Sequence, residues 1–189
     1  MHAEAELPRR HRLTVSDYYR MAEVGILDPE ARVELIEGEI IDMAPPGSPH
    51  AGTVNYLAEV LIRAIGDRAS ALVQNPVRLS QYSEPQPDVA LLRRRDDFYR
   101  ERHPTSADVL LIVEVAATSL RFDRKTKLPL YARHGIPEMW LVDLGGRRLV
   151  RYRAPQHGAY TLVDEPDLGQ PLEVAALAGV SLDLHRLYA

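Results

Sequence analysis

The sequence predicts an α/β protein in which helices pack on a mixed β-sheet with additional β-hairpins. Segments with helical spacing of apolar residues alternate along the chain with short segments typical of strands. Residues 109–115 are almost continuously apolar and rich in β-branched side chains, which is typical of a strand covered on both faces. Glycines mark two tight turns, one at Gly38 and one at Gly145 and Gly146.

The first elements are a short helix and a hairpin. Residues 14–23 have helical spacing, with Thr14 or Ser16 as the N-cap and an end near Gly25. Residues 32–43 are typical of two short strands that turn at Gly38.

A proline-rich loop over residues 45–49 then leads into a longer helix. Its apolar residues recur at helical spacing from Val54 to Ile65, and Gly66 is its expected end. Strands are expected over residues 71–79 and 89–92, with a turn-rich segment between them.

The second half of the chain begins with a charged stretch, residues 93–103, that we interpret as a surface helix. The apolar run 109–115 is expected to be the central strand of the sheet. The remaining expected elements are a helix over 123–134 ended by Gly135, a hairpin of 138–143 with 147–152, and short strands in the tail over 161–189.

Composition sets the class of protein. The 189 residues are 46% hydrophobic, which fits one domain over residues 1–189 with its own core. The absence of cysteine excludes disulfides, thiolate zinc sites, iron–sulfur clusters and cysteine nucleophiles. No apolar run reaches the roughly 18 residues of a membrane span, and the N-terminus is polar, so we expect a cytoplasmic protein without a membrane partner.

Two carboxylates stand at strand positions where they are unusual. Glu114 lies inside the apolar run, and a buried carboxylate there must be paired, protonated or metal-bound; the alternative is a strand-end side chain that faces water. Asp88 follows Pro87 at the start of another apolar strand, where it could equally be a simple turn residue. If the two strands are neighbours, both carboxylates reach one point and suit a hard cation such as magnesium.

A helical face follows the Glu114 strand. Asp123, Lys127 and Tyr131 are spaced four residues apart and so lie on one side of the expected helix. Lys127 could stabilise charge that develops on a phosphate, or it could form an exposed pair with Asp123. The direction of this face relative to Glu114 separates the two alternatives.

Two further residues are weaker candidates. Glu34 lies in an early strand with Glu37 and Glu39 nearby, so alternation does not select one inward carboxylate. His50 lies in the proline-rich loop just before the expected helix, where it could be a residue of the N-terminal turn, a ligand or a phosphate contact. No glycine-rich phosphate loop, GxSxG elbow, HExxH pair or dinucleotide fingerprint is present, so those enzyme classes are not expected.

Several segments together resemble the Uma2 family, whose fold is that of the PD-(D/E)xK restriction endonucleases. They occur in the family's order and cover most of the chain. The matching segments are residues 34–40, 48–50, 86–89, 113–115, 123–127 and 131, and 135–143. The last of these, with its Glu-Met-Trp-Leu-Val-Asp strand, is the most specific.

This resemblance implies a site and a fold. It implies a restriction-endonuclease-like mixed central sheet flanked by helices. Asp88 and Glu114 are the implied metal-binding and catalytic carboxylates, with Glu34 as an upstream helper that also binds metal. The wider fold usually carries its lysine two residues after the second carboxylate, where this chain has Ala116. The Uma2 pattern places the lysine on the next helix, which implies Lys127, with Lys125 as a competitor.

The chain departs from the family pattern at two places. A serine and proline usually follow the Glu-Val pair, whereas Ala116, Ala117, Thr118 and Ser119 stand here. Pro129 falls inside the expected helix, where it removes a backbone donor at a typical cost of about 3 kcal/mol unless the helix adjusts. The second departure bears on the direction in which Lys127 points.

The first functional hypothesis is a Mg2+-dependent DNA endonuclease, with Mn2+ as a substitute and with His50 and Tyr131 as supporting residues. A homodimer, the commonest oligomeric form, would let such an enzyme cut both strands. The alternative is a catalytically decayed fold that binds nucleic acid or a protein.

The net charge of −4 is unevenly distributed. Between Arg121 and Arg153 nine basic residues stand against three acidic ones, which is an excess of +6, so the rest of the chain carries −10. A basic helix and hairpin next to the expected carboxylates would attract phosphate, or they could simply be solvated. The negative total therefore does not exclude a nucleic-acid partner.

Overall fold

The computed structural model describes residues 10–28 and 30–189, which form two compact units. The first unit comprises Met1–Ala44 and Leu79–Pro85, and the second comprises Pro45–Arg78 and Gln86–Ala189. A single domain over residues 1–189 stays a prediction, and its residues 1–9 and 29 lie outside the described part.

The described part of the first unit contains a helix and a hairpin. These are α1 (Val15–Glu23), β1 (Val33–Ile36) and β2 (Glu39–Asp42). Thr14 is the N-cap of α1, because its hydroxyl accepts from the Asp17 N–H at 3.1 Å and Asp17 accepts from the Thr14 N–H at 2.8 Å. Glu37 and Gly38 form the hairpin turn with φ of 52° and 86°. A Cβ on Gly38 would lie 2.6 Å from Cβ of Arg12, so this turn requires glycine.

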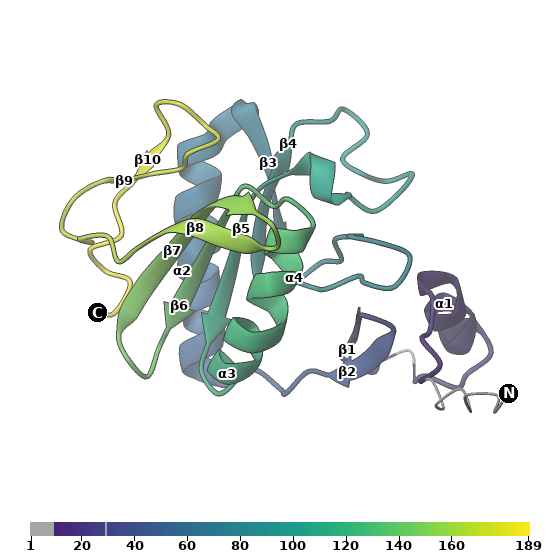
Figure 1. The fold of residues 1–189 in the computed structure, drawn as a ribbon. Helices are drawn as coiled ribbons and strands as arrows, with labels where there is room; N and C mark the ends of the chain where they lie inside the picture. Colours follow the sequence, from purple (N-terminus) through teal and green to yellow (C-terminus); the bar gives the residue numbers. More distant parts are fainter. Residues whose placement is uncertain (1–9, 29) are drawn as a thin grey trace, which may run out of the picture. The chain divides into compact units, whose positions relative to one another are not determined.

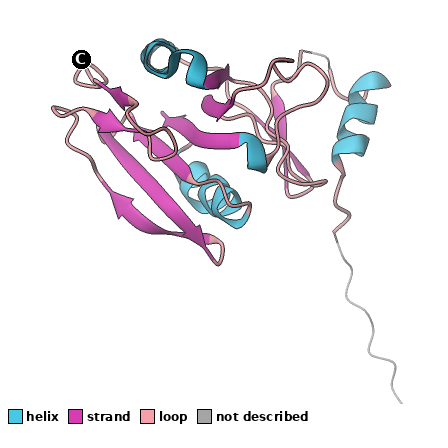
Figure 2. Cartoon of the chain, turned by 90° about the horizontal axis from the view of Figure 1, so that it is seen from above, coloured by secondary structure: helices cyan, strands magenta, loops and turns pink. Residues whose placement is uncertain are grey.

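The second unit is built on a six-stranded sheet in the order β3-β4-β5-β6-β7-β8 (Figure 1), seen from above in Figure 2. Its strands are β3 (Ala69–Val73), β4 (Val89–Arg93), β5 (Val109–Ala116), β6 (Glu138–Asp143), β7 (Arg148–Gln156) and β8 (Ala159–Asp164). β5 and β6 are parallel and all other neighbours are antiparallel. Every residue of β5 is buried, which confirms the predicted central strand and the mixed α/β fold.

Helices cover both faces of this sheet (Figure 1). They are α2 (Ser48–Ile65) on one face and, in succession on the other, α3 (Leu120–Phe122), η3 (Asp123–Lys127) and α4 (Leu128–Arg133). Short 3-10 turns, η1 (Gly66–Arg68) and η2 (Ser106–Asp108), precede β3 and β5. Leu57 and Leu61 of α2 belong to one core with Val89 and Val113. Because side chains alternate along a strand, Glu114 faces the α3–α4 side.

No helix within residues 10–28 and 30–189 has the length and apolar character needed to cross a bilayer.

The prediction for residues 93–103 is wrong, because this segment forms turns and no helix. Phe98 and Tyr99 have φ of 50° and 60°, which is left-handed backbone that a right-handed helix excludes.

Two other boundaries differ from expectation. The strand expected over 71–79 ends at Val73, since Gln74 has a φ of 50° and Pro76 cannot donate to a ladder. α2 begins at Ser48, with Pro49 in its first turn, where a missing N–H costs nothing. His50 therefore lies in the N-terminal turn of the helix, which is one of the alternatives expected for it.

A buried carboxylate ties the tail to the sheet. The tail forms a small pair, β9 (Leu172–Glu173) with β10 (Ser181–Leu182). Glu138 of β6 accepts from Nε1 of Trp140 at 2.7 Å and from the N–H of Ala175 at 2.8 Å. Burial raises the pKa of Glu138 above its ordinary value, against the opposing effect of these hydrogen bonds.

This raised pKa predicts a pH-dependent effect of Glu138→Gln on stability. A carboxyl whose pKa is higher in the folded chain contributes most below its unfolded pKa, and that contribution falls as pH rises through the folded pKa. The variant lacks this titration, so its free energy of unfolding relative to wild type is expected to be higher at pH 7.5 than at pH 4. Urea unfolding at both pH values measures the difference, with the exposed Glu173→Gln as the control. A difference that stays constant with pH would contradict the prediction.

Candidate active site

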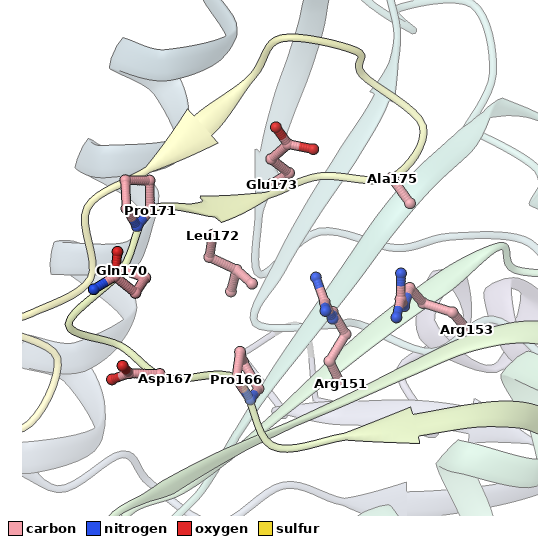
Figure 3. A pocket seen from close by; sticks show the side chains of 9 residues that line it. All are labelled: Arg151, Arg153, Pro166, Asp167, Gln170, Pro171, Leu172, Glu173 and Ala175. Atoms are coloured by element: carbon pink, nitrogen blue, oxygen red, sulfur yellow. The ribbon is translucent and has the colours of Figure 1, made fainter.

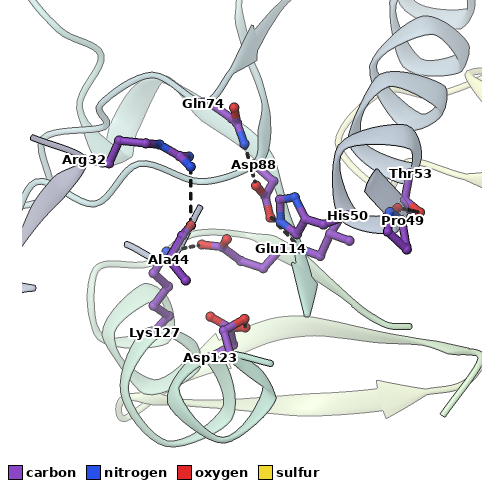
Figure 4. A network of polar contacts seen from close by, with 12 residues as sticks. Arg32, Ala44, Pro49, His50, Thr53, Gln74, Asp88, Glu114, Asp123 and Lys127 are labelled. Atoms are coloured by element: carbon purple, nitrogen blue, oxygen red, sulfur yellow. Dashed lines mark hydrogen bonds and ion pairs between the residues drawn. The ribbon is translucent and has the colours of Figure 1, made fainter. Parts of the chain in front are cut away.

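Three polar residues lie in one row across the sheet. The register pairs Val73 with Val89 and Val89 with Val113, and one further step places Gln74, Asp88 and Glu114 opposite one another. Directly opposed residues of antiparallel strands have Cα atoms about 5 Å apart and project to the same face. In Figure 4, Asp88 lies beside His50, and the carboxylate of Glu114 is directed toward Lys127. The two strands are neighbours, which is the condition for the expected convergence of the two carboxylates.

Asp88 is held by three hydrogen-bonding groups. Its Oδ2 accepts from the N–H of Val115 at 2.8 Å and lies 3.2 Å from Nε2 of His50, and its Oδ1 accepts from Nε2 of Gln74 at 3.2 Å. Burial by itself would raise the pKa of Asp88, but the bonds from His50, Val115 and Gln74 and the charge of His50 hold it below its ordinary value. Asp88 is thus a preorganised anion at neutral pH.

Glu114 is contacted by the following helix. Nζ of Lys127 lies 3.1 Å from Oε1 of Glu114, and the hydroxyl of Tyr131 donates to the same oxygen at 2.6 Å. The side chains of Glu114 and Lys127 are 4% and 7% exposed, so this is a buried ion pair. The helical face of Asp123, Lys127 and Tyr131 is directed into the protein, and the alternative of an exposed Asp–Lys pair is wrong.

A widened helical turn accommodates Pro129. The turn η3 is a π-helix in which the N–H of Leu128 donates to the carbonyl of Asp123, five residues back. In an α-helix, the Pro129 ring would clash with the carbonyl four residues earlier. Because the π turn ends at Lys127, the distortion that Pro129 requires lies at the residue that contacts Glu114. Asp123, at its start, accepts from the hydroxyl of Ser119 at 2.6 Å.

The other predicted residues lie elsewhere. Lys125 is exposed, whereas Lys127 is buried against Glu114. Ala116 is two residues beyond Glu114 and shares its face, but it carries no charge. The lysine that contacts Glu114 comes from the helix instead. Glu34 is buried on β1 of the first unit, and its part in the site stays a prediction.

Gln74 is a member of this cluster that the sequence did not indicate. Its only signal is its position at the end of an expected strand, and register across two strand pairs is needed to place it opposite Asp88.

The donor set fits a hard cation. Among the described residues, no group of three or more His, Asp and Glu side chains forms a ready-made ligand set. Mg2+ is often bound in proteins by one or two carboxylates, with water and substrate phosphate completing its shell. Asp88, which precedes β4, and Glu114 of the neighbouring strand β5 are two oxygen donors that match that pattern.

A pocket of about 370 Å³ lies away from these carboxylates (Figure 3). Arg151 and Arg153 of β7 line it, and their register partners are Trp140 and Glu138, on the face opposite to Glu114. Both arginines pair with Asp164, at 2.7 Å and 3.2 Å. Asp164 therefore offsets part of their charge within the protein, and we take the carboxylate row as the stronger candidate site.

Comparisons with known proteins bear on the family and the fold. The model of the Uma2 family, described as "Putative restriction endonuclease", matches residues 15–185. A crystal structure described as a putative nuclease belonging to DUF820, from Anabaena variabilis, has a TM-score of 0.68 at 15% identity. The match covers 93% of this chain and 97% of the other. No curated protein matches. The structural likeness confirms the expected fold.

Proposed function

Because this chain belongs to the Uma2 family of putative restriction endonucleases, we propose that it is a metal-dependent endonuclease that hydrolyses phosphodiester bonds of DNA. The family and the structural neighbour support a nuclease, an enzyme that acts on nucleic acid. The observation that carries the finer proposal is the row of two opposed carboxylates with Lys127 Nζ 3.1 Å from Glu114.

Asp88 and Glu114 would hold a Mg2+ ion. When bound, such an ion lowers the pKa of a water ligand and neutralises charge on the phosphate. Asp88 is kept ionised by its hydrogen bonds, and His50 and Gln74 fix its orientation. Tyr131 fixes Glu114 in the same way. The ammonium of Lys127 stabilises negative charge that develops on the phosphate oxygens in the transition state.

Cleavage of supercoiled plasmid DNA tests this proposal. The wild type is expected to nick or linearise the plasmid in Mg2+ or Mn2+ and to stop when EDTA removes the ion. A preparation of Glu114→Gln, purified in parallel, is expected to cleave on the order of tenfold more slowly or worse. Glu59→Gln is the matched control, because Glu59 is an exposed carboxylate on α2 whose partner is Arg63. Cleavage that persists in EDTA or is equal in Glu114→Gln would overturn the proposal.

A second candidate is a decayed fold that binds without cutting. The observation in its favour is that Glu114 already bonds to Lys127 and Tyr131 inside the protein, next to a loop that departs from the family pattern. Calorimetric titration with Mn2+ separates the two functions. A decayed site is expected to give no heat that depends on Asp88 and Glu114, and the enzyme is expected to bind Mn2+ through both.

A further inference from the structure

The loop between β4 and η2 presents an exposed aromatic ring among arginines. We name residues 93–103 the arginine loop, because it holds five arginines against three acidic residues. Phe98 is 54% exposed. The guanidinium groups of Arg94 and Arg100 lie 4.8 Å and 5.8 Å from the centre of its ring. The ring of Phe98 is thus exposed to solvent and flanked by positively charged side chains.

The backbone of this loop is strained and firmly anchored. Left-handed φ values at two successive aromatic residues, Phe98 and Tyr99, are unfavourable for side chains with a Cβ. Tyr99 is buried and its hydroxyl donates to the carbonyl of Arg93 at 2.6 Å. Arg95 forms a two-pronged bond with Asp97, at 2.8 Å and 2.6 Å. Strained backbone that the surroundings hold in place is enriched at functional sites.

The loop lies in the same unit as the carboxylates, at the other end of β4 (Figure 1). Asp88 immediately precedes β4 and the arginine loop begins with Arg93 at its end, which is five residues or about 17 Å along the strand. That separation corresponds to about five base steps of B-form DNA. Arg93, the first residue of the arginine loop, therefore lies about five base steps from Asp88 along β4.

We propose that the arginine loop is a second nucleic-acid contact, in which Phe98 stacks on an unpaired base and Arg94 and Arg100 bind the flanking phosphates. This inference rests on the proposed function. Proteins hold unpaired strands by stacking bases on aromatic rings and arginine planes inside positively charged grooves. The ring, its two guanidinium groups and the excess of positive charge match both parts of that ligand.

Fluorescence anisotropy with labelled oligonucleotides in EDTA, where no metal-dependent cleavage occurs, tests the proposal on the full chain. The probes are a DNA single strand, the same strand as a blunt duplex, a duplex with an unpaired extension, and an RNA single strand. Phe98→Asn removes the ring while keeping a residue that tolerates left-handed backbone, so folding is retained. It is expected to weaken binding of the single strand and the extended duplex by about tenfold and of the blunt duplex by less than about twofold.

The arginines have a separate signature. Arg94→Gln with Arg100→Gln is expected to weaken binding to all probes. On single strands, the slope of log K against log salt is expected to fall by about 0.7 for each phosphate that the double variant no longer neutralises. Arg63→Gln, an exposed arginine on α2, is the matched control. Phe98→Tyr keeps an aromatic ring, so it is expected to bind the single strand about as tightly as the wild type does.

Each of the other possible outcomes of these experiments would overturn one part of the proposals. Wild-type affinity of Phe98→Asn for the single strand overturns the stacking contact, and an equal loss on the blunt duplex overturns the unpaired base as its ligand. Self-association that depends on Phe98, with unchanged DNA affinity, reassigns the loop to a protein contact and overturns the proposal. Phe98-dependent binding without plasmid cleavage overturns the catalytic proposal and leaves the stacking proposal standing. Plasmid cleavage without Phe98-dependent binding overturns the stacking proposal and leaves the catalytic proposal standing.

Discussion

Replacing Asp88 with asparagine is expected to reduce the rate of plasmid cleavage by about 10²–10³-fold. The carboxylate is held as an anion by the Val115 N–H, His50 and Gln74, and the amide that replaces it carries no charge for a cation. The NH2 group of the amide would also face neighbours that donate hydrogen bonds to Asp88, so part of this hydrogen-bond shell is lost. Initial rates of supercoiled plasmid loss in Mg2+, at fixed salt, measure the effect.

The control for this variant is Asp67→Asn, an exposed aspartate in η1 that has the same change of charge. Calorimetric titration with Mn2+ gives a second readout, in which Asp88→Asn is expected to bind more weakly than the control. If Asp88→Asn cleaves and binds Mn2+ like the wild type, Asp88 is not a metal-binding carboxylate. A loss of cleavage with intact Mn2+ binding would instead assign Asp88 to positioning of His50.

Replacing Lys127 with methionine is expected to lower the free energy of unfolding by about 3–5 kcal/mol, the cost typical of removing one member of a buried ion pair. Methionine fills a similar volume but leaves the carboxylate of Glu114 buried without this cation. Lys125→Met is the matched control, because Lys125 is exposed and lies two residues away, and it is expected to change stability by less than about 0.5 kcal/mol. Urea unfolding at pH 7.5 measures both.

The double variant Glu114→Gln with Lys127→Met separates the pair from the packing around it. Glutamine keeps an acceptor for the Tyr131 hydroxyl and carries no charge, so the double variant is expected to be more stable than the sum of the single losses predicts, by about 0.5–3 kcal/mol. Additive losses would show that Glu114 and Lys127 are not coupled in solution. Equal stability of Lys127→Met and Lys125→Met would contradict the buried pair itself.

The lysine that contacts Glu114 comes from the helix after β5 and not from β5 itself. In β5 the position two residues after Glu114 is Ala116, a side chain without charge. Lys127, at the end of the π turn that accommodates Pro129, contacts the carboxylate of Glu114. The proline that conflicted with a regular helix over 123–134 is thus compatible with the contact between Lys127 and Glu114.

The sequence by itself determined the elements whose causes are local. The Gly38 turn and the apolar run of β5 follow from side-chain chemistry and periodicity within a few residues, and both lie where they were expected. The cap of α1 is Thr14, one of the two residues that the sequence offered for it. The prediction for 93–103 failed because charge pattern alone does not report the left-handed backbone at Phe98 and Tyr99.

Only the tertiary structure decided which residues meet. Gln74, Asp88 and Glu114 become neighbours through strand register, which joins segments up to 40 positions apart in the chain. The choice between Lys127 and Lys125 as the partner of Glu114 depends on which helical face packs on the sheet. Register and packing are long-range properties, set by the burial of whole faces, so no window of the sequence contains them.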